Sequence, residues 1–215
     1  MMARGKQELA AAPAYWATAK RELARNDPVL GAIIRSYPRI HLQSRADPFQ
    51  TLARSIVGQQ ISVRAAQSVW DRLCMAAPGV TPASVLVLER TVLRACGLSE
   101  RKTEYIADLA RHFEAGTVCV RQWQELNDEE VIADLVRVRG IGRWTAEMFL
   151  IFNLLRPDVL PVDDLGLQRA VSVAYRNGRR LSVAGLRRMA QAWRPWRSVA
   201  TWYLWRSLDP LPVEY

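Results

Sequence analysis

The stretch Leu135–Met148, LVRVRGIGRWTAEM, decides the fold class. Residues that favour helices flank the four-residue turn RGIG, which is too short for anything except a tight hairpin. Gly140 and Gly142 have no side chain to keep a phosphate away, and both can adopt a positive φ. Their amides would point outward at the positive end of the second helix dipole, where an anion is favoured. The sequence therefore predicts a hairpin that binds a DNA backbone, with Arg143 and Thr145 adding charged and hydroxyl donors.

Signals for further helices recur along the chain. Apolar residues at helical spacing follow five capping sites, namely Asp47 with Pro48, Ser62, Thr81 with Pro82, Ser99 and Asn127. We expect the helix after Thr81 to continue to about Gly97. Alternation typical of strands is missing from the sequence, so we predict an all-α fold.

The chain is expected to form two helical subdomains that flank a cleft for DNA and for the active site. One subdomain spans residues 48–162 and contains the helix-hairpin-helix motif at about residues 128–155. The other combines N-terminal helices in residues 1–47 with the C-terminal basic helices in residues 163–215.

Charge points to a polyanionic partner. The chain has 215 residues, half of them hydrophobic, and a formal net charge of +9. Between Arg169 and Arg206 there are nine arginines and neither aspartate nor glutamate. This run is either a solvated basic face or a surface that contacts phosphates, and its one-sidedness favours the second interpretation.

Several classes of protein are excluded by what the sequence lacks. Three widely spaced cysteines form no metal-ligand pair, so we expect reduced and mostly buried thiols. The two histidines have no ligand-like neighbours, which argues against a zinc site or a histidine-based triad. The N-terminus has no apolar run of the length of a signal peptide, and no membrane span follows. We therefore expect a cytoplasmic protein that is a monomer and does not bind membranes.

Two adjacent carboxylates, Asp163 and Asp164, follow the hairpin by about twenty residues. An aspartate before an amphipathic helix is most often an N-cap, and we assign this role to Asp163. Capping does not explain the second acid, Asp164, and a carboxylate close to the phosphates of bound DNA is expected only where it has a function. Breaking an N-glycosidic bond develops oxocarbenium character on the sugar, which one carboxylate can stabilise while it orients water.

Four segments together resemble the helix-hairpin-helix DNA glycosylases, specifically those of the 3-methyladenine DNA glycosylase II type. Two of them are LVRVRGIGRWTAEMFL and LPVDDLGLQRAV. DPFQTLARSIVGQQISVRAAQSVWDRL resembles the first core helices of that family, and WRPWRSVATWYLW resembles its C-terminal helix. The resemblance covers the chain from about Asp47 to Trp205, without the N-terminal β-rich domain of longer members.

The resemblance implies roles for the residues at matching positions. It makes Asp164 the catalytic residue, and Gly140 and Gly142 phosphate binders. Base flipping also requires an aromatic slot and a wedge that fills the gap in the duplex. The base pocket implied by the family consists of Trp144, Met148, Leu165 and Trp205.

The family's wedge falls at Gln60 or Ile61, whereas the neighbouring Gln59 could make a buried polar or backbone contact. Met148 and Leu165 stand where some relatives have aromatic residues, which implies a roomier slot. The family further implies a monovalent cation, Na⁺ or K⁺, at the backbone carbonyls of Val136, Val138 and Ile141, and no other cofactor.

The implied activity is that of a monofunctional glycosylase in base excision repair. It would flip alkylated bases such as 3-methyladenine and 7-methylguanine out of double-stranded DNA and leave an abasic site. Trp144 stands where the bifunctional branch has a lysine nucleophile, so no lyase step is expected. The alternatives are a non-enzymatic helix-hairpin-helix DNA-binding module, a glycosylase for oxidised or deaminated bases, and a protein that binds membranes through its C-terminus.

Overall fold

Helices account for all the regular structure in the described part of the chain. The computed structural model describes residues 12–44 and 47–208, where thirteen α-helices and one 3₁₀ helix occur and no strand is found. The predicted all-α class is therefore confirmed. The expectation that the N-terminus carries no signal peptide concerns residues 1–11 and lies outside the described residues.

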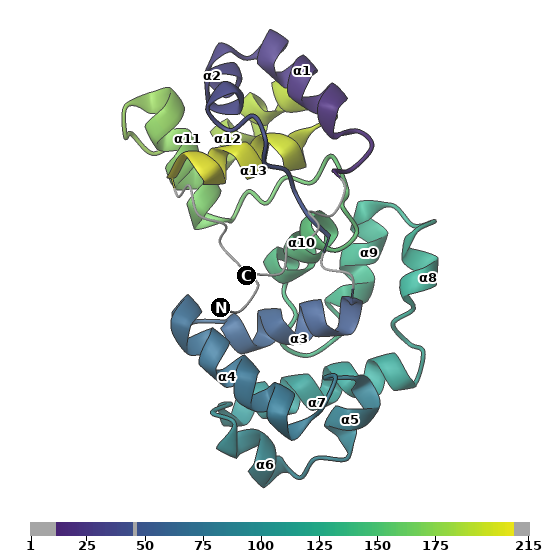
Figure 1. Cartoon of the computed structure of the whole chain (residues 1–215). Coiled ribbons are helices and arrows are strands. Elements are labelled where there is room, and N and C mark those ends of the chain that lie inside the picture. Colours follow the sequence, from purple (N-terminus) through teal and green to yellow (C-terminus); the bar gives the residue numbers. More distant parts are fainter. Residues whose placement is uncertain (1–11, 45–46, 209–215) are drawn as a thin grey trace, which may run out of the picture.

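The helices divide into two groups that lie one above the other in Figure 1. The group that we call the upper lobe brings the two ends of the described chain together, because α2 and α11 both pack on α13. It consists of α1 (Trp16–Asn26), α2 (Pro28–Ser36), α11 (Leu165–Arg176), α12 (Val183–Met189), η1 (Ala190–Trp193) and α13 (Arg197–Leu208).

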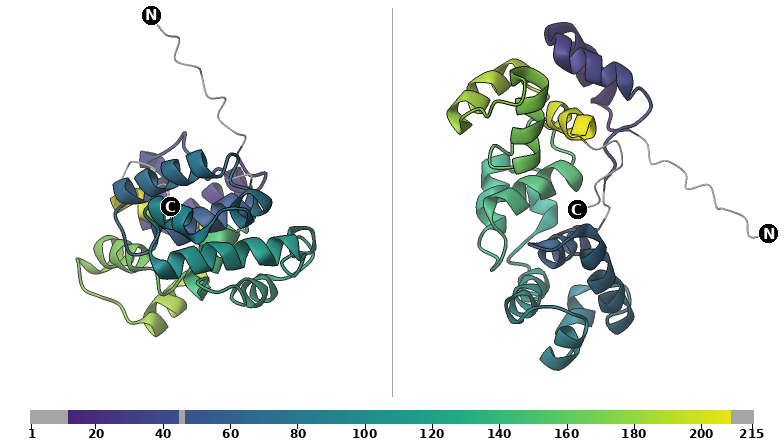
Figure 2. Two further views of the ribbon diagram at one scale, coloured as in Figure 1. Left: turned by 90° about the horizontal axis from the view of Figure 1, so that it is seen from below. Right: turned by 90° about the vertical axis from the view of Figure 1, so that its left-hand side faces the viewer.

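The lower lobe is continuous in sequence, and its helix α10 lies toward the upper lobe (Figures 1 and 2). Helix α7 is its centre, since α3, α5 and α6 all pack against it. The lobe consists of α3 (Pro48–Gly58), α4 (Val63–Ala76), α5 (Pro82–Leu86), α6 (Arg90–Ala95), α7 (Glu100–Glu114), α8 (Val120–Trp123), α9 (Asp128–Leu135) and α10 (Arg143–Phe152).

Short-range capping fixes where most of these helices begin. Each of the five predicted capping side chains accepts a hydrogen bond from the first turn of its helix. One prediction of length is wrong, because the expected helix from Thr81 to Gly97 is broken between α5 and α6. Glu89 is extended there, and Val85 and Leu93 are buried on either side of the break. Packing of both short helices on α7 outweighs the local preference for one helix.

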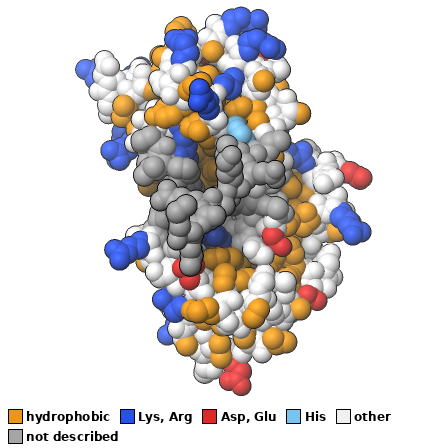
Figure 3. Space-filling view, in the orientation of Figure 1, with side chains coloured by type: hydrophobic (Ala, Val, Ile, Leu, Met, Phe, Trp, Pro, Cys, Tyr) orange, Lys and Arg blue, Asp and Glu red, His pale blue; other side chains and the backbone are white. Residues whose placement is uncertain are grey.

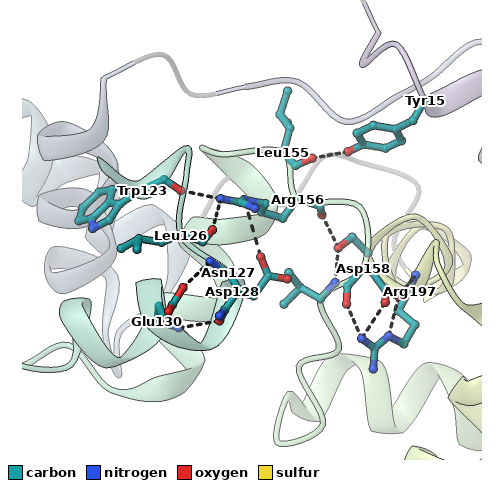
Figure 4. Close-up of polar contacts among 12 residues, drawn as sticks. Tyr15, Trp123, Leu126, Asn127, Asp128, Glu130, Leu155, Arg156, Asp158 and Arg197 are labelled. Atoms are coloured by element: carbon teal, nitrogen blue, oxygen red, sulfur yellow. Dashed lines mark hydrogen bonds and ion pairs between the residues drawn. The ribbon is translucent and has the colours of Figure 1, made fainter. Parts of the chain in front are cut away.

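The segment between α10 and α11 joins the lobes and is tied to both (Figure 4). On the lower side, the Arg156 guanidinium donates to the carbonyl oxygens of Trp123 and Leu126, at 2.5 and 2.8 Å. On the upper side, Arg197 of α13 donates to both carboxylate oxygens of Asp158, at 2.6 and 2.9 Å. These contacts set the position of the residues that follow, including the start of α11.

Apolar side chains from both lobes form one continuous buried cluster. All three cysteines are free, but the expectation that most are buried is wrong. Only Cys96 is buried, whereas Cys74 is exposed on α4 and Cys119 is half-buried. Within the described ranges, no helix has the length and apolar character needed to cross a bilayer.

Candidate active site at the start of helix α11

Asp164 lies at the junction of the lobes and is only 6% exposed. Its Oδ1 accepts hydrogen bonds from the Leu167 amide at 2.6 Å and from the Trp205 indole at 2.8 Å. Its Oδ2 accepts from the Trp144 indole at 2.9 Å. Because Trp144 belongs to α10 and Trp205 to α13, one carboxylate connects the two lobes. Three donors hold this group in a single orientation, as a preorganised charge requires.

The N-cap of α11 is Asp164 and not Asp163, so our assignment of that role is corrected. The Leu167 amide, three residues into the helix, binds Asp164, whereas the Asp163 side chain is exposed. The candidate catalytic group is thus also the cap. The capping bond from the Leu167 amide goes to Oδ1 alone. The bonds from the Trp205 and Trp144 indoles, to Oδ1 and Oδ2, come from residues outside α11.

The predicted helix-hairpin-helix is formed by α9, the turn and α10, but its two glycines differ. Gly140 has a φ of +85°, and an added Cβ would lie 2.3 Å from Cδ2 of Tyr105. Gly142 has a φ of −93° and caps α10, with open space where a side chain would be. Gly140 is therefore required by backbone conformation and close packing, whereas Gly142 leaves the start of α10 accessible to a phosphate.

A cavity of about 470 Å³ opens between α3, α4 and the start of α10. It brings together residues for which we predicted different roles: Trp144 and Met148 of the base pocket, Gln60 and Ile61 of the wedge, and Gly142 and Thr145 of the backbone-binding set. Gln60 and Ile61 are both exposed, and Gln60 has a φ of +58°. The predicted wedge thus lies at the rim of the cavity into which a base could turn.

Three predicted residues lie elsewhere than expected. Thr145 is 4% exposed and lines the cavity, so it does not lie on the outer surface of the hairpin. Leu165 is 78% exposed at the start of α11 and does not line the cavity. Trp205 also lies outside the lining; it stacks on Phe152 and donates to Asp164. Of the four predicted pocket residues, the structure brings only Trp144 and Met148 to this cavity.

Arg143, the predicted charged donor of the hairpin, is held by two carboxylates. Its guanidinium binds both oxygens of Glu129, at 2.5 and 2.9 Å, and Nε donates to Glu147 at 3.0 Å. Its hydrogen bond to Glu129 raises the pKa of Arg143 and lowers that of Glu129. Glu147 is buried, and burial raises its pKa to about 7 despite Arg143. These bonds use three of the five guanidinium N–H donors of Arg143, and its side chain is 47% exposed, so the remaining donors could bind a phosphate.

Three residues of this region were not predicted from the sequence, namely Lys102, Tyr105 and Glu147. Lys102 of α7 donates to two carbonyl oxygens beside the predicted wedge, and Tyr105 packs under Gly140. No local pattern marks Lys102 or Tyr105, because their partners are more than thirty residues away. Glu147 differs, since it lies one helical turn after its partner Arg143, and that spacing was a local signal. The contact considered for Gln59 is present, since its Nε2 donates to the Gly140 carbonyl at 2.8 Å.

Comparison with known proteins decides the family. A model described as HhH-GPD superfamily base excision DNA repair protein matches residues 53–197. The chain belongs to this superfamily. Among curated relatives, DNA-3-methyladenine glycosylase 1 of Schizosaccharomyces pombe is 30% identical over 179 residues, which cover 81% of this chain and 78% of the relative.

Solved structures similar to this HhH-GPD protein include 3-methyladenine DNA glycosylases. The DNA-3-methyladenine glycosidase of Bacillus halodurans matches with a TM-score of 0.81 and 35% identity, covering 89% of each chain. The 3-methyladenine DNA glycosylase of Schizosaccharomyces pombe, solved in complex with abasic DNA, matches with a TM-score of 0.79 and 27% identity. That match covers 92% of this chain and 99% of the other. The family prediction is confirmed.

Proposed function

We propose that this HhH-GPD protein is a monofunctional DNA glycosylase that removes alkylated bases, such as 3-methyladenine and 7-methylguanine, from double-stranded DNA. One observation carries the proposal. The Asp164 carboxylate is held by the indole N–H of Trp144, and the same Trp144 lines the cavity beside the exposed turn at Gln60. A fixed negative charge, an aromatic surface and a side chain able to enter the duplex are what base extrusion and excision need together.

The chemistry follows from the positions of these groups. A base extruded into the cavity would contact Trp144, with its sugar toward Asp164. The bond between C1′ of the deoxyribose and the ring nitrogen breaks, and its electron pair leaves with the base. An alkylated purine already carries a positive charge and therefore departs without an acid. Asp164 stabilises the sugar cation and orients a water molecule, whose oxygen bonds to C1′ and whose proton passes to solvent.

The reaction ends at an abasic site. A lyase step needs an amine nucleophile that forms a Schiff base with the opened sugar. Trp144 stands where the family resemblance implies a lysine in the bifunctional branch, and an indole nitrogen cannot serve in this way. This argument supports hydrolysis as the whole activity.

In this proposal the protein acts as a cytoplasmic monomer. Its hairpin holds the DNA backbone. The open face at Gly142 and the start of α10 would accept one phosphate. The carbonyls of Val136 and Ile141 have no hydrogen-bond partner among the described residues, whereas that of Val138 accepts from Ile141. Such oxygens suit a hard cation, so these three would hold Na⁺ or K⁺, whose charge would offset that of the phosphate.

Incubation with methylated duplex DNA tests the proposal. We expect the unmodified protein to release 3-methyladenine and 7-methylguanine, identified by mass. Asp164→Asn should lower the single-turnover rate by roughly 10²–10³-fold, which is the usual effect of removing a preorganised charge. Asp163→Asn is the matched control, because it removes a neighbouring exposed charge, and it should retain the rate.

Three outcomes would overturn parts of this proposal. Release of no base by the unmodified protein would leave only a DNA-binding module. Full activity of Asp164→Asn would remove the catalytic role from this residue. A covalent adduct trapped by borohydride would show that a lyase step occurs.

A further inference from the structure

One face of α7 contacts both of the loops that the proposed function assigns to DNA. Lys102, Tyr105 and Asp108 are spaced three residues apart and so lie along one side of the helix. The first contacts the end of α3, and the other two contact the hairpin. Neither loop contains these residues, and the proposed reaction does not use them.

Lys102 fixes the turn that carries Gln60 and Ile61. Its Nζ donates to the carbonyl oxygens of Val57 and Gln59, at 2.8 and 2.7 Å. These carbonyls lie at the C-terminal end of α3, where the helix leaves its last acceptors unsatisfied and its dipole favours a cation. Lys102 is half-buried, and burial lowers its pKa, so its two acceptors are needed to offset the lost hydration.

Tyr105 and Asp108 fix the hairpin from the same helix. The Tyr105 ring lies so close to the Gly140 Cα that an added Cβ would be 2.3 Å from Cδ2. Asp108 Oδ2 accepts a hydrogen bond from the Arg139 amide at 3.0 Å. The hairpin therefore rests directly on α7 at two consecutive residues.

A direct bond between the two loops completes the arrangement. Gln59 Nε2 donates to the Gly140 carbonyl oxygen at 2.8 Å, so the residue before Gln60 is tied to the hairpin. Gln60 itself has a φ of +58°, a conformation that a non-glycine residue keeps only when its surroundings enforce it. Two contacts hold the residue before Gln60 in place: Lys102 binds the Gln59 carbonyl oxygen, and the Gln59 side chain binds the hairpin.

We propose that Lys102 is a positioning residue that holds the Gln60–Ile61 turn at the distance from the phosphate-binding hairpin at which base flipping occurs. The inference rests on the proposed roles of that turn and of the hairpin. Without Lys102, the turn would sample other conformations, while the hairpin would still bind phosphates. The loss should therefore fall on flipping and on the excision rate, and much less on binding of intact duplex.

Lys102→Met tests this role against Arg101→Met as a matched control. Both variants remove one positive charge from consecutive positions on α7, but Arg101 is exposed and does not contact the turn. Flipping is measured as the rise in fluorescence of 2-aminopurine placed beside an abasic site in duplex DNA. This readout needs no bond cleavage, so it tests the inference even if the unmodified protein excises no base.

We expect Lys102→Met to reduce the fluorescence rise and the single-turnover excision rate by roughly tenfold, with the Kd for undamaged duplex changed by less than about threefold. Arg101→Met should leave all three near their original values, and Lys102→Arg should restore part of the flipping. If Lys102→Met does not fold, Lys102→Gln, which removes the positive charge but keeps a polar side chain, takes its place in the same measurements. Flipping by the folded variant equal to that of Arg101→Met would overturn the inference.

Discussion

Glu147 shows how a single buried carboxyl can shape the response of the hairpin to pH. It lies on α10, almost fully buried, and its hydrogen-bond partner is Arg143. Burial raises its pKa to about 7 and outweighs the opposing effect of Arg143, while the nearby charges of Asp163 and Glu129 raise it slightly further. Near neutral pH this carboxyl therefore exists in both protonation states, unlike an exposed glutamate.

We predict that Glu147→Gln alters the pH dependence of stability. The folded-state pKa is raised, so the folded protein binds more protons than the unfolded chain between pH 4.5 and about pH 7. Stability from this group is full below pH 4.5 and is lost as the pH rises to 7. The free energy of unfolding of Glu147→Gln relative to the unmodified protein should thus increase by about 1–3 kcal/mol from pH 5 to pH 8. Urea titrations at four pH values measure it; a difference independent of pH would contradict the assignment.

Single residues also mark where prediction from sequence reached its limit. The importance of the acidic pair was evident, but which acid capped α11 was not, because both positions precede the helix and differ only in burial by Trp144 and Trp205. Lys102 was missed for a related reason. Its acceptors lie 43 and 45 residues away in the chain, so only the packing of α3 on α7 reveals them.

At the scale of elements, the hairpin separates two uses of glycine. Gly140 provides a left-handed conformation and room for Tyr105, whereas Gly142 provides an open surface at the N-terminus of α10. The sequence motif GxG treats both positions alike. The structure assigns the first to folding and the second to contact with a ligand.

Alanine should therefore lower mainly the stability of the protein at position 140 and mainly its affinity for DNA at position 142. Gly140→Ala should lower the free energy of unfolding by more than about 2 kcal/mol, because a positive φ and a clash with Tyr105 act together. Gly142→Ala should change it by less than about 1 kcal/mol, yet raise the Kd for duplex DNA roughly tenfold by placing a methyl group where a phosphate approaches. Thermal unfolding and fluorescence anisotropy measure the two effects. Equal stability of both variants would refute the division of roles.

Most of the element boundaries were accessible from short stretches of sequence. Asp47 with Pro48, Ser62, Ser99 and Asn127 cap helices where expected, because a cap needs only residues within one turn. The break before α6 was not accessible, since it depends on how Val85 and Leu93 meet α7. Local chemistry thus predicted helix starts, and tertiary packing decided helix lengths.

At the scale of the whole molecule, charge is distributed unevenly. On the face shown in Figure 3, Lys and Arg gather over the upper lobe, whereas most Asp and Glu lie on the lower lobe. Arg187 and Arg188 of α12 are exposed, and Arg187 is near enough to Glu129 of the hairpin motif to lower its pKa. Arg187 therefore brings positive charge toward the hairpin motif, and we expect α12 to extend the contact with a duplex.

The salt dependence of DNA binding should report this contact. The logarithm of the association constant falls with the logarithm of salt concentration by about 0.9 for each phosphate neutralised. We expect the double variant Arg187→Gln/Arg188→Gln to make this slope shallower by roughly 1–2. The control Arg21→Gln/Arg25→Gln, which removes two exposed arginines from α1, should keep the original slope. An unchanged slope in the α12 variant would exclude this helix from the interface.

The connection between the lobes determines whether Asp164 can act. Asp158 and Arg197 join the interlobe segment to α13 through two short hydrogen bonds, with side chains only 24% and 15% exposed. Bidentate pairs shielded from water are stronger than surface ion pairs. Since Asp164 lies only six residues after Asp158, loosening this pair should let the carboxylate of Asp164 shift relative to Trp144.

A double-mutant cycle with Asp158→Asn and Arg197→Gln tests that connection. We expect a coupling energy of about 1.5–3 kcal/mol in urea unfolding, because each single variant leaves a charged partner unpaired in a shielded position. The single-turnover excision rate should fall in both single variants by more than their Kd for undamaged duplex rises, since the hairpin lies in the lower lobe and keeps its own contacts. A coupling near zero, or a rate and a Kd that change by the same factor, would show that the pair does not set the position of Asp164.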